Sequence, residues 1–264
     1  MKYNGNIILA AHRGDKKNFP ENTIPAFESA IKLGLDMIET DIHMTLDGEL
    51  IIMHDRNTKR TTGYDGNIDE MTYELIKKLD AGAWFSNEFK NTRVPSVKEF
   101  IELIKDTDML VNWELKDYPS VVGEEFSYRS ADKLIELIEE NGLTDRSMMN
   151  SFSDRVLEHI YLKHGHRFSI HGQGILNCQK TIDNASVSQE QLYNWCCLYP
   201  NLPNTRPMDF PENFEYCIEN GIYPCVCVPD TLETYSMYIK LGCKMFTSNN
   251  IYEGNEILKA LHVR

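Results

Sequence analysis

Short apolar runs alternate with amphipathic segments along this chain, and the three nearest its N-terminus each stop at a charged or imidazole side chain. They cover residues 7–11, 35–38 and 50–53. Apolar runs of this length with β-branched side chains are typical of buried strands. Between the first two runs, apolar residues recur at helical spacing from Ile24 to Gly34, which predicts a helix.

After the second apolar run, the chain no longer alternates between strand and helix patterns. Asp47-Gly48 is a hairpin turn signal that returns the chain along residues 49–54. Residues 56–95 then scatter glycines and Pro95 among polar side chains. We interpret them as a partly helical insertion after the second strand.

Strand and helix patterns alternate again through the rest of the chain. Ser96 and Glu99 predict a capping box at the start of a helix. Further strands are predicted at 109–116, 147–152, 168–171, 193–198, 223–228 and 244–247. Further helices are predicted at 130–141, 153–165 and 213–219, from a cap at Asp230 and Glu233 to Gly242, and at 256–261. Residues 172–190 are ambiguous.

Alternation of this kind implies parallel strands joined by right-handed crossovers. The count is consistent with eight units. We therefore predict an α/β protein, a (β/α)8 TIM barrel built by residues 1–264 as a single domain, with the small insertion at about 56–95. Active sites of this fold lie at the C-terminal ends of the strands.

Composition narrows the class of protein. The formal net charge of −13 argues against a nucleic-acid partner or an anionic membrane surface, because both favour basic proteins. The apolar runs fall short of the roughly 18 residues of a membrane span, and the N-terminus does not resemble a signal peptide. We therefore expect a cytoplasmic protein without stable membrane insertion. The sequence leaves the oligomeric state open.

The cysteines point to the same compartment. Their number is odd, seven, and without an export signal they indicate reduced thiols. Cys196-Cys197 and Cys225-x-Cys227 raise the question of metal ligation. No Cys or His pair stands at matching zinc-site spacing, so we interpret these residues as buried thiols in strands.

Ionisable side chains follow the three N-terminal runs. Glu39 and Asp41 are two residues apart on the second predicted strand and therefore point to the same face. Two carboxylates so close repel each other unless a cation lies between them, and oxygen ligands suit Mg²⁺ or Ca²⁺. His12 and His54 supply groups whose charge changes near neutral pH. The pattern indicates metal-assisted acid–base chemistry.

Other polar residues are predicted to meet these groups at the barrel mouth. Asn112, Glu114 and Lys116 share one face of the strand at 109–116, where a buried strand is normally apolar. His171 ends a predicted strand and is a further histidine to examine there. His43 shares the face of Asp41, either as a support for the site or as a spacer; these alternatives stay open. 

Five short motifs resemble the glycerophosphodiester phosphodiesterase family in both order and spacing. They are His12-Arg13-Gly14, Pro20-Glu21-Asn22-Thr23, Glu39-x-Asp41, Thr45-x-Asp47-Gly48 and His54-Asp55. The resemblance implies a metal-dependent phosphodiesterase that hydrolyses small-molecule glycerophosphodiesters to glycerol 3-phosphate and an alcohol.

The resemblance also suggests roles for the site residues. One divalent cation, Mg²⁺ or Ca²⁺, would be held by Glu39, Asp41 and Glu114. Arg13 and Lys116 would bind the phosphate, Arg13 with its forked donors. One of His12 and His54 would deprotonate the nucleophile, and the other would protonate the departing alkoxide.

Several alternatives remain at this point. The sequence does not say which histidine is the acid, or whether the nucleophile is water or a neighbouring substrate hydroxyl, which would give a cyclic phosphate first. Relatives of this family act on lysophospholipids or sphingolipids, and such a substrate would need an apolar rim beside the mouth. A non-catalytic phosphodiester-binding barrel is the alternative from another class, disfavoured by the presence of both histidines and all three carboxylates.

The resemblance weakens after residue 120. Near the seventh strand the family usually carries Trp-Thr-Val-Asn, whereas this chain has Val226-Cys227-Val228-Pro229. We expect Val226 to take the place of the tryptophan at the mouth. That side of the pocket would then be wider and less polar, and would accept bulkier alcohol groups.

Overall fold

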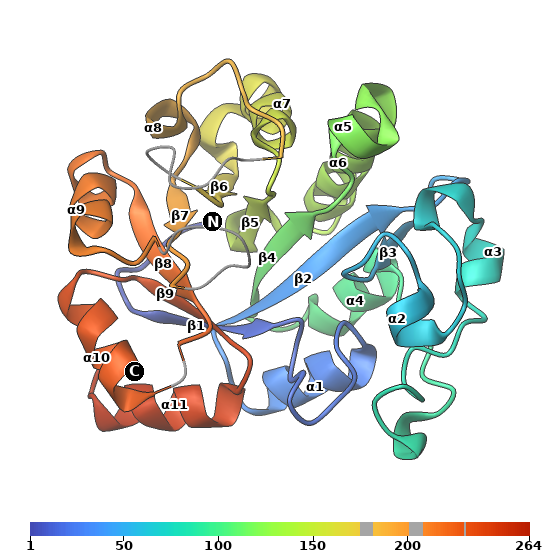
Figure 1. Cartoon of the computed structure of the whole chain (residues 1–264), viewed down its shortest axis with the longest axis horizontal. Coiled ribbons are helices and arrows are strands. Elements are labelled where there is room, and N and C mark those ends of the chain that lie inside the picture. The colour runs from blue at the N-terminus through green and yellow to red at the C-terminus, as the bar shows by residue number, and fades with distance from the viewer. Residues whose placement is uncertain (175–181, 201–207, 230) are drawn as a thin grey trace.

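Eight parallel strands close into a barrel surrounded by helices in the computed structural model of this chain (Figure 1). The structure describes residues 1–174, 182–200, 208–229 and 231–264. The barrel strands are β1 (Ile8–His12), β2 (Met37–Met44), β4 (Leu110–Leu115), β5 (Ser147–Asn150), β6 (Ser169–Gly172), β7 (Trp195–Cys197), β8 (Tyr223–Cys227) and β9 (Met245–Ser248). They follow one another around the ring, and β9 pairs with β1 to close it. The predicted (β/α)8 barrel is confirmed.

The helices form the outer layer in Figure 1. The longer ones are α1 (Ile24–Lys32), α4 (Val97–Ile104), α6 (Glu124–Glu140), α7 (Asp154–His164), α9 (Pro211–Glu219), α10 (Leu232–Lys240) and α11 (Ile251–Ala260). Short turns of α-helix are α2 (Lys59–Thr62), α3 (Tyr73–Ile76), α5 (Pro119–Val122) and α8 (Gln189–Leu192). The 3₁₀ turns are η1 (Ile68–Glu70), η2 (Asn87–Phe89), η3 (Thr144–Arg146) and η4 (Gly165–Arg167).

Helix starts follow local hydrogen bonding. The Ser96–Glu99 capping box of α4 is present with both of its bonds, as predicted. The start of α10 differs from the prediction, because Thr231 caps it together with Thr234. Asp230, the expected cap, lies outside the described residues. Asp and Thr are both good N-cap residues, so the sequence alone did not decide between Asp230 and Thr231.

A hairpin extends β2 beyond its barrel neighbours. His43 and Met44 pair with β3 (Leu50–Ile52), which runs antiparallel to β2. The turn at Asp47-Gly48 is confirmed, with Gly48 at φ 85°. The third apolar run is therefore a hairpin strand outside the barrel ring. Because it runs backwards, it carries the chain from the tip of β2 down again toward the mouth.

The insertion has a small core of its own. Residues 56–95 contain four short helical turns, as the sequence indicated. A separate apolar cluster, which includes Ile51, Met53, Ile68 and Val94, packs the insertion against β3. The insertion therefore braces the hairpin from the outside.

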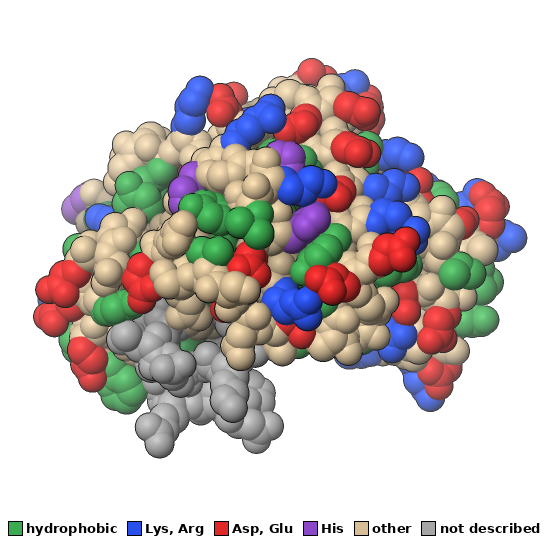
Figure 2. All heavy atoms as spheres, turned by 90° about the horizontal axis from the view of Figure 1, so that it is seen from above, with side chains coloured by type: hydrophobic (Ala, Val, Ile, Leu, Met, Phe, Trp, Pro, Cys, Tyr) green, Lys and Arg blue, Asp and Glu red, His purple; other side chains and the backbone are tan. Residues whose placement is uncertain are grey.

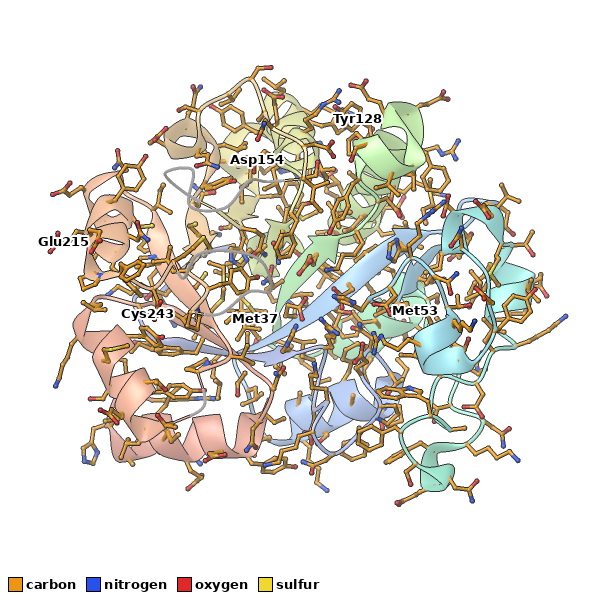
Figure 3. All side chains as sticks on the ribbon, viewed as in Figure 1. Met37, Met53, Tyr128, Asp154, Glu215 and Cys243 are labelled. Atoms are coloured by element: carbon orange, nitrogen blue, oxygen red, sulfur yellow. The ribbon has the colours of Figure 1, made fainter. Side chains whose placement is uncertain are left out.

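Side chains on the strands alternate between the barrel interior and the helix layer. Met37, Glu39 and Asp41 share the phase of β2 that points inward, so the interior is apolar at the start of this strand and ionisable further along. Figure 3 shows Met37 near the centre of the ring among the other inward side chains. All three residues are buried. The polar layer therefore lies at the C-terminal end of the barrel, where this fold places its sites.

The surface shows no concentration of one charge on the face drawn in Figure 2, where acidic and basic side chains are interspersed. Within the described residues, no helix combines the length and the apolar character needed to cross a bilayer.

Candidate active site

Three carboxylates from two adjacent strands meet inside the barrel mouth. Glu39 and Asp41 lie on β2 and Glu114 lies on β4, with Asp41 and Glu114 paired in register. All three are buried, and one oxygen of each lies within 4.8 Å of the others. The structure thus brings together the acidic cluster that the sequence predicted.

Two basic side chains offset part of this negative charge. Lys116 Nζ lies 3.1 Å from Asp41 Oδ1 and also bonds Glu114, while Arg13 Nε lies 3.4 Å from Asp41 Oδ2. Although burial opposes the shift, Lys116 and then Arg13 hold the pKa of Asp41 far below its usual range. Burial raises the pKa of Glu39, and the negative charges of Asp41 and Glu114 raise it further. Two cationic side chains therefore do not suffice for three buried carboxylates.

The cluster fits a divalent cation. Oε1 of Glu39 is buried and has no hydrogen-bond partner within the described part of the chain, which is costly for a carboxylate oxygen. A cation held by Glu39, Asp41 and Glu114 would satisfy this oxygen and remove the repulsion among the three groups. A donor set made only of oxygens suits hard cations.

His12 lies at the end of β1 beside this cluster. Its Nδ1 donates a hydrogen bond of 2.6 Å to Oδ1 of Asn249, which leaves Nε2 4.0 Å from Glu39 Oε2. Burial, followed by the charge of Arg13, lowers the pKa of His12 to about 3. The imidazole is therefore neutral at pH 7 and has a free ring nitrogen at the mouth. Sequence reasoning missed Asn249, although its position directly after the last barrel strand was a usable signal.

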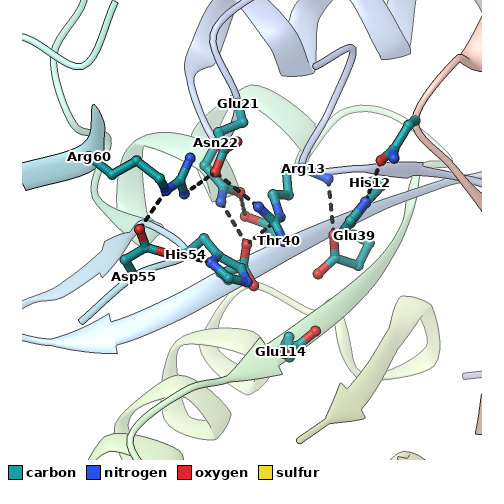
Figure 4. A network of polar contacts seen from close by, with 12 residues as sticks. His12, Arg13, Glu21, Asn22, Glu39, Thr40, His54, Asp55, Arg60 and Glu114 are labelled. Carbon is teal, nitrogen blue, oxygen red and sulfur yellow. Dashed lines mark hydrogen bonds and ion pairs between the residues drawn. The ribbon is translucent and has the colours of Figure 1, made fainter. Parts of the chain in front are cut away.

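His54 belongs to a chain of polar contacts that runs back to Arg13 (Figure 4). Its Nδ1 lies 2.5 Å from Asp55 Oδ1, and Arg60 Nε lies 2.5 Å from Asp55 Oδ2. Glu21 Oε1 accepts from Arg60 at 2.7 Å and from Arg13 at 3.0 Å. The chain couples the orientation of a candidate acid–base group to that of a candidate phosphate ligand. Arg60 and Glu21 were not among the predicted site residues.

A buried pair holds the backbone of His54. His43 Nδ1 donates to Asp117 Oδ1 at 2.7 Å, and His43 Nε2 lies 3.4 Å from the carbonyl oxygen of His54. Asp117 also accepts from the backbone N–H of Met44 at 2.8 Å. These contacts favour the supporting role for His43. Burial, followed by the charge of Lys116, lowers the pKa of His54, while Asp41 and the hydrogen bond to Asp55 oppose this shift.

The loop between β1 and α1 contributes through unusual backbone angles. Arg13 and Asn22 have φ values of 58° and 56°, which non-glycine residues seldom adopt and which cost about 1–3 kcal/mol each. Asn22 Nδ2 donates to Asp41 Oδ2 at 2.7 Å, and Thr40 donates to Asn22 Oδ1. The strain is offset by bonds that fix the acidic cluster. Asn22 was missed as a site residue, although it belongs to a recognised motif.

A small cavity joins this cluster to the opposite side of the mouth. His12, Glu39 and Glu114 line one side. The other side is lined by residues that include Asn150, His171, Gln173, Tyr199 and Cys227. His171 therefore does reach the mouth. The amides and Tyr199 were missed because their segments carry no motif.

Val226 does not line this cavity, so its expected place at the mouth is wrong. It is fully buried in the apolar core. The residues on either side of it face the barrel interior: Cys225 contacts His171, and Cys227 lines the cavity. Because strand side chains alternate, the inward position on β8 belongs to Cys227. The prediction of a wider wall at position 226 fails with it.

Most of the thiols are buried, as the sequence indicated. Six of the seven cysteines lie in the described residues, and all six are buried and form no disulfide there. The seventh, Cys178, lies outside the described residues.

Known proteins resemble this chain in sequence and in fold. The Glycerophosphoryl diester phosphodiesterase family matches residues 12–196. A glycerophosphodiester phosphodiesterase of Caldanaerobacter subterraneus is 35% identical over 241 residues, which cover 89% of this chain and 90% of that protein.

Solved structures agree on the fold. A phosphodiesterase of Oleispira antarctica, in complex with the product sn-glycerol-3-phosphate, has a TM-score of 0.81 at 20% identity and covers 96% of this chain and 97% of its own. A glycerophosphodiester phosphodiesterase of Agrobacterium tumefaciens has a TM-score of 0.72 at 21% identity, covering 93% and 97% respectively. The match over residues 12–196 and the relative that spans nearly the whole chain show that this protein belongs to the glycerophosphoryl diester phosphodiesterase family.

Proposed function

We propose that this protein is a phosphodiesterase that hydrolyses glycerophosphodiesters to glycerol 3-phosphate and an alcohol. The family match and the 35% identical relative, itself named a glycerophosphodiester phosphodiesterase, support this activity. The similar fold of the Oleispira enzyme, which was solved with sn-glycerol-3-phosphate, agrees with it. The observation that carries the proposal is the meeting of three carboxylates and two histidines at one barrel mouth.

Glu39, Asp41 and Glu114 are the proposed ligands of one divalent cation, Mg²⁺ or Ca²⁺. Such a cation neutralises negative charge on the non-bridging oxygens of a phosphodiester as the transition state forms. The unsatisfied oxygen of Glu39 and the raised pKa of its carboxyl group support this assignment.

Arg13 and Lys116 are the proposed phosphate ligands. Both lie within 3.5 Å of Asp41, from opposite carboxylate oxygens, so a phosphate at the cluster is within reach of both. The guanidinium of Arg13 is held in place by Glu21, which prepares its remaining donors for an anion. Charge from these side chains acts where the reaction builds negative charge.

His12 and His54 are the proposed acid–base pair. One, as a neutral imidazole, takes a proton from the nucleophile. The other must carry a proton on both ring nitrogens when the substrate is bound, and it gives one of them to the departing alkoxide, which is a poor leaving group without it. Each has its Nδ1 engaged, by Asn249 and Asp55 respectively, so proton transfer falls to Nε2 in both rings.

A lysophospholipid is a second candidate substrate, favoured by an aromatic cluster beside the site. Phe19 packs on Phe89, Phe89 on Phe85 and Phe85 on Trp84, with ring centroids 5.4–5.8 Å apart. Trp84 is 42% exposed, and the guanidinium of Arg60 lies 5.9 Å from its ring. This exposed apolar edge offers a place for an acyl chain next to the polar chain of His54.

A substrate panel tests both candidates. Purified protein with Mg²⁺ or Ca²⁺ is given glycerophosphocholine, glycerophosphoethanolamine and lysophosphatidylcholine, and the phosphorus products are followed by ³¹P NMR. Glycerol 3-phosphate should form from the first two, and an early cyclic phosphate would identify the substrate hydroxyl as nucleophile. Binding of the diesters without turnover would overturn the proposal in favour of a binding protein.

Trp84→Ala separates the two substrates. If the aromatic edge holds an acyl chain, the variant should lose about tenfold in kcat/KM on lysophosphatidylcholine, a typical effect of removing one apolar contact surface. Its kcat/KM on glycerophosphocholine serves as the control and should stay near that of the parent. Equal losses on both substrates would rule out a specific acyl site at Trp84.

A further inference from the structure

A second group of metal-ligating side chains lies inside the barrel, on the side opposite the carboxylates. His171 on β6, Cys197 on β7 and Cys225 on β8 are buried, and their ligand atoms all lie within 4.8 Å of one another. Cys225 Sγ is 3.1 Å from His171 Nε2. Three neighbouring strands thus each contribute one nitrogen or sulfur donor to a single point.

Strand register explains why these residues meet. Cys197 and Cys225 are partners across β7 and β8. Cys197 lines the cavity at the mouth, and Cys225 contacts His171, which also lines it. Cys196, the residue before Cys197, faces the helix layer instead, where its thiol interacts with that of Cys217 on α9. Cys227 is two residues beyond Cys225, and its thiol hydrogen-bonds with that of Cys197. Within the described residues, Cys227 is therefore a further sulfur donor beside this group.

The donor set differs in kind from the carboxylate cluster. Thiolate sulfur and imidazole nitrogen select thiophilic metals, whereas Mg²⁺ and Ca²⁺ take oxygen ligands. Zn²⁺ binds sulfur at about 2.3 Å and nitrogen at about 2.0 Å in tetrahedral sites, so its ligand atoms lie roughly 3.4–3.8 Å from one another. A cluster already within 4.8 Å needs only small side-chain movements to reach that arrangement.

A neighbouring amide supplies independent support. Asn112 Nδ2 lies 3.2 Å from His171 Nδ1, and Asn112 Oδ1 is buried with no hydrogen-bond partner in the part of the chain that the structure describes. If His171 binds a metal through Nε2, its proton moves to Nδ1. A rotation of the Asn112 amide then lets Oδ1 accept that proton, which satisfies the unpaired oxygen. Hydrogen-bond partners of this kind orient the histidines that bind metals.

We propose that His171, Cys197 and Cys225 form a second cation site for a thiophilic metal such as Zn²⁺, with Cys227 as its fourth ligand. Three thiol groups within the barrel each release a proton to solvent as Zn–S bonds form, so binding becomes tighter as pH rises. The inference does not depend on the proposed phosphodiesterase activity. The site would add metal ligation to the buried thiols that the sequence predicted, since the fold gathers donors that sequence spacing keeps apart.

Cobalt absorption tests the site in the whole protein. The protein is stripped of metal with a chelator, kept reduced, and titrated with Co²⁺, which shows sulfur-to-metal charge-transfer bands only when thiolates bind it. We expect one equivalent of Co²⁺ with these bands, displaced by one equivalent of Zn²⁺. Mg²⁺ and Ca²⁺ should not displace it, because these cations prefer oxygen ligands and bind thiolates weakly.

Matched variants locate the signal. Cys225→Ser should abolish the bands, and Asn112→Ala should weaken Zn²⁺ binding by about 10–100-fold. Cys217→Ser is the control, a buried thiol of the helix layer, and should keep them. X-ray absorption of the zinc-loaded parent keeps the test independent of folding defects in the variants. Sulfur neighbours at about 2.3 Å support the site, whereas a shell made only of oxygen and nitrogen, or bands that survive Cys225→Ser, overturns it.

Discussion

His12 and His54 have contrasting partners at the level of single residues. His12 donates to a neutral amide, that of Asn249, whereas His54 pairs with the carboxylate of Asp55. A carboxylate stabilises an imidazolium more strongly than an amide does. The two environments therefore separate the proton affinities of the two rings, which is the arrangement expected of an acid and a base that act together.

Replacing either histidine with alanine should lower kcat by on the order of 10²-fold or more, because each variant loses one proton transfer. The pH–rate profile of the parent should be bell-shaped, and each variant should lose one limb. Cation affinity, measured by calorimetry, should change little, since neither ring belongs to the carboxylate cluster. A near-normal kcat for His54→Ala would show that His54 is a structural residue.

His171 should make the metal-free protein sensitive to acid. Burial alone lowers its pKa to about 3 in the folded state, against about 6.5 when unfolded. The unfolded state therefore binds an extra proton between these values, and folding stability falls as pH drops from about 6.5 toward 3. The expected slope from this residue is about 1.4 kcal/mol per pH unit.

Urea unfolding at pH 7, 6, 5 and 4 measures this effect, with His171→Asn as the comparison. Other titrating groups are shared by the two proteins, so the difference isolates His171. The free energy of unfolding should fall more steeply in the parent. Parallel curves would mean that His171 does not remain neutral in the folded protein.

Residue spacing was enough to predict the carboxylates but not every inward side chain. Glu39 and Asp41 had to share a face, because side chains two residues apart on a strand point to the same side. On β8, Val226 and its cysteine neighbours are all compatible with burial, so the sequence could not set the phase. Pairing with β7 and β9 sets it, and that information is not local.

The β2–β3 hairpin is the element that delivers His54 to the mouth. Its tip is tied to the barrel by Asp117, which accepts from His43, from the backbone of Met44 and from Ser130 on α6. One buried carboxylate thus joins the hairpin to a helix of the outer layer. The position of His54 depends on this junction as well as on its own partners.

Asp117→Asn should therefore impair both stability and catalysis. The amide can accept fewer bonds, and we expect a loss of about 1–3 kcal/mol in the free energy of unfolding. A small displacement of His54 should also lower kcat by about 10–100-fold.

Asp132→Asn is the matched control, because Asp132 also pairs with a histidine, His159, but on the outside of the barrel. It should leave kcat unchanged and cost less than about 1 kcal/mol. Equal effects of the two substitutions on kcat would contradict the role of the hairpin junction.

Local sequence signals predicted the start or turn of an element well where only one such signal was present. The Asp-Gly turn specified the hairpin, and the Ser96–Glu99 pair specified the start of α4. They failed where neighbours competed, as at the start of α10, where Thr231 rather than Asp230 provides the cap. The antiparallel direction of β3 followed from the turn, but its exclusion from the ring depends on strand lengths that only the closed barrel fixes.

At the scale of the whole molecule, barrel closure creates the site. His12 near the start of the chain meets Asn249 near its end because β1 pairs with β9. We propose that residues 1–264 act as one domain, with 56–95 as an insertion that braces the hairpin. The alternation of strands and helices was sufficient to predict the ring. The contacts across it were not predictable, because they join residues with no shared motif.

The central claim is that three carboxylates hold a cation on which phosphodiester hydrolysis depends. The most direct measurement is turnover of glycerophosphocholine after exhaustive chelation, followed by addition of Mg²⁺ or Ca²⁺. We predict that chelation abolishes turnover and that one of these cations restores it, with a rise in thermal stability as the cation binds the native state. Full turnover in the chelated protein would contradict the account.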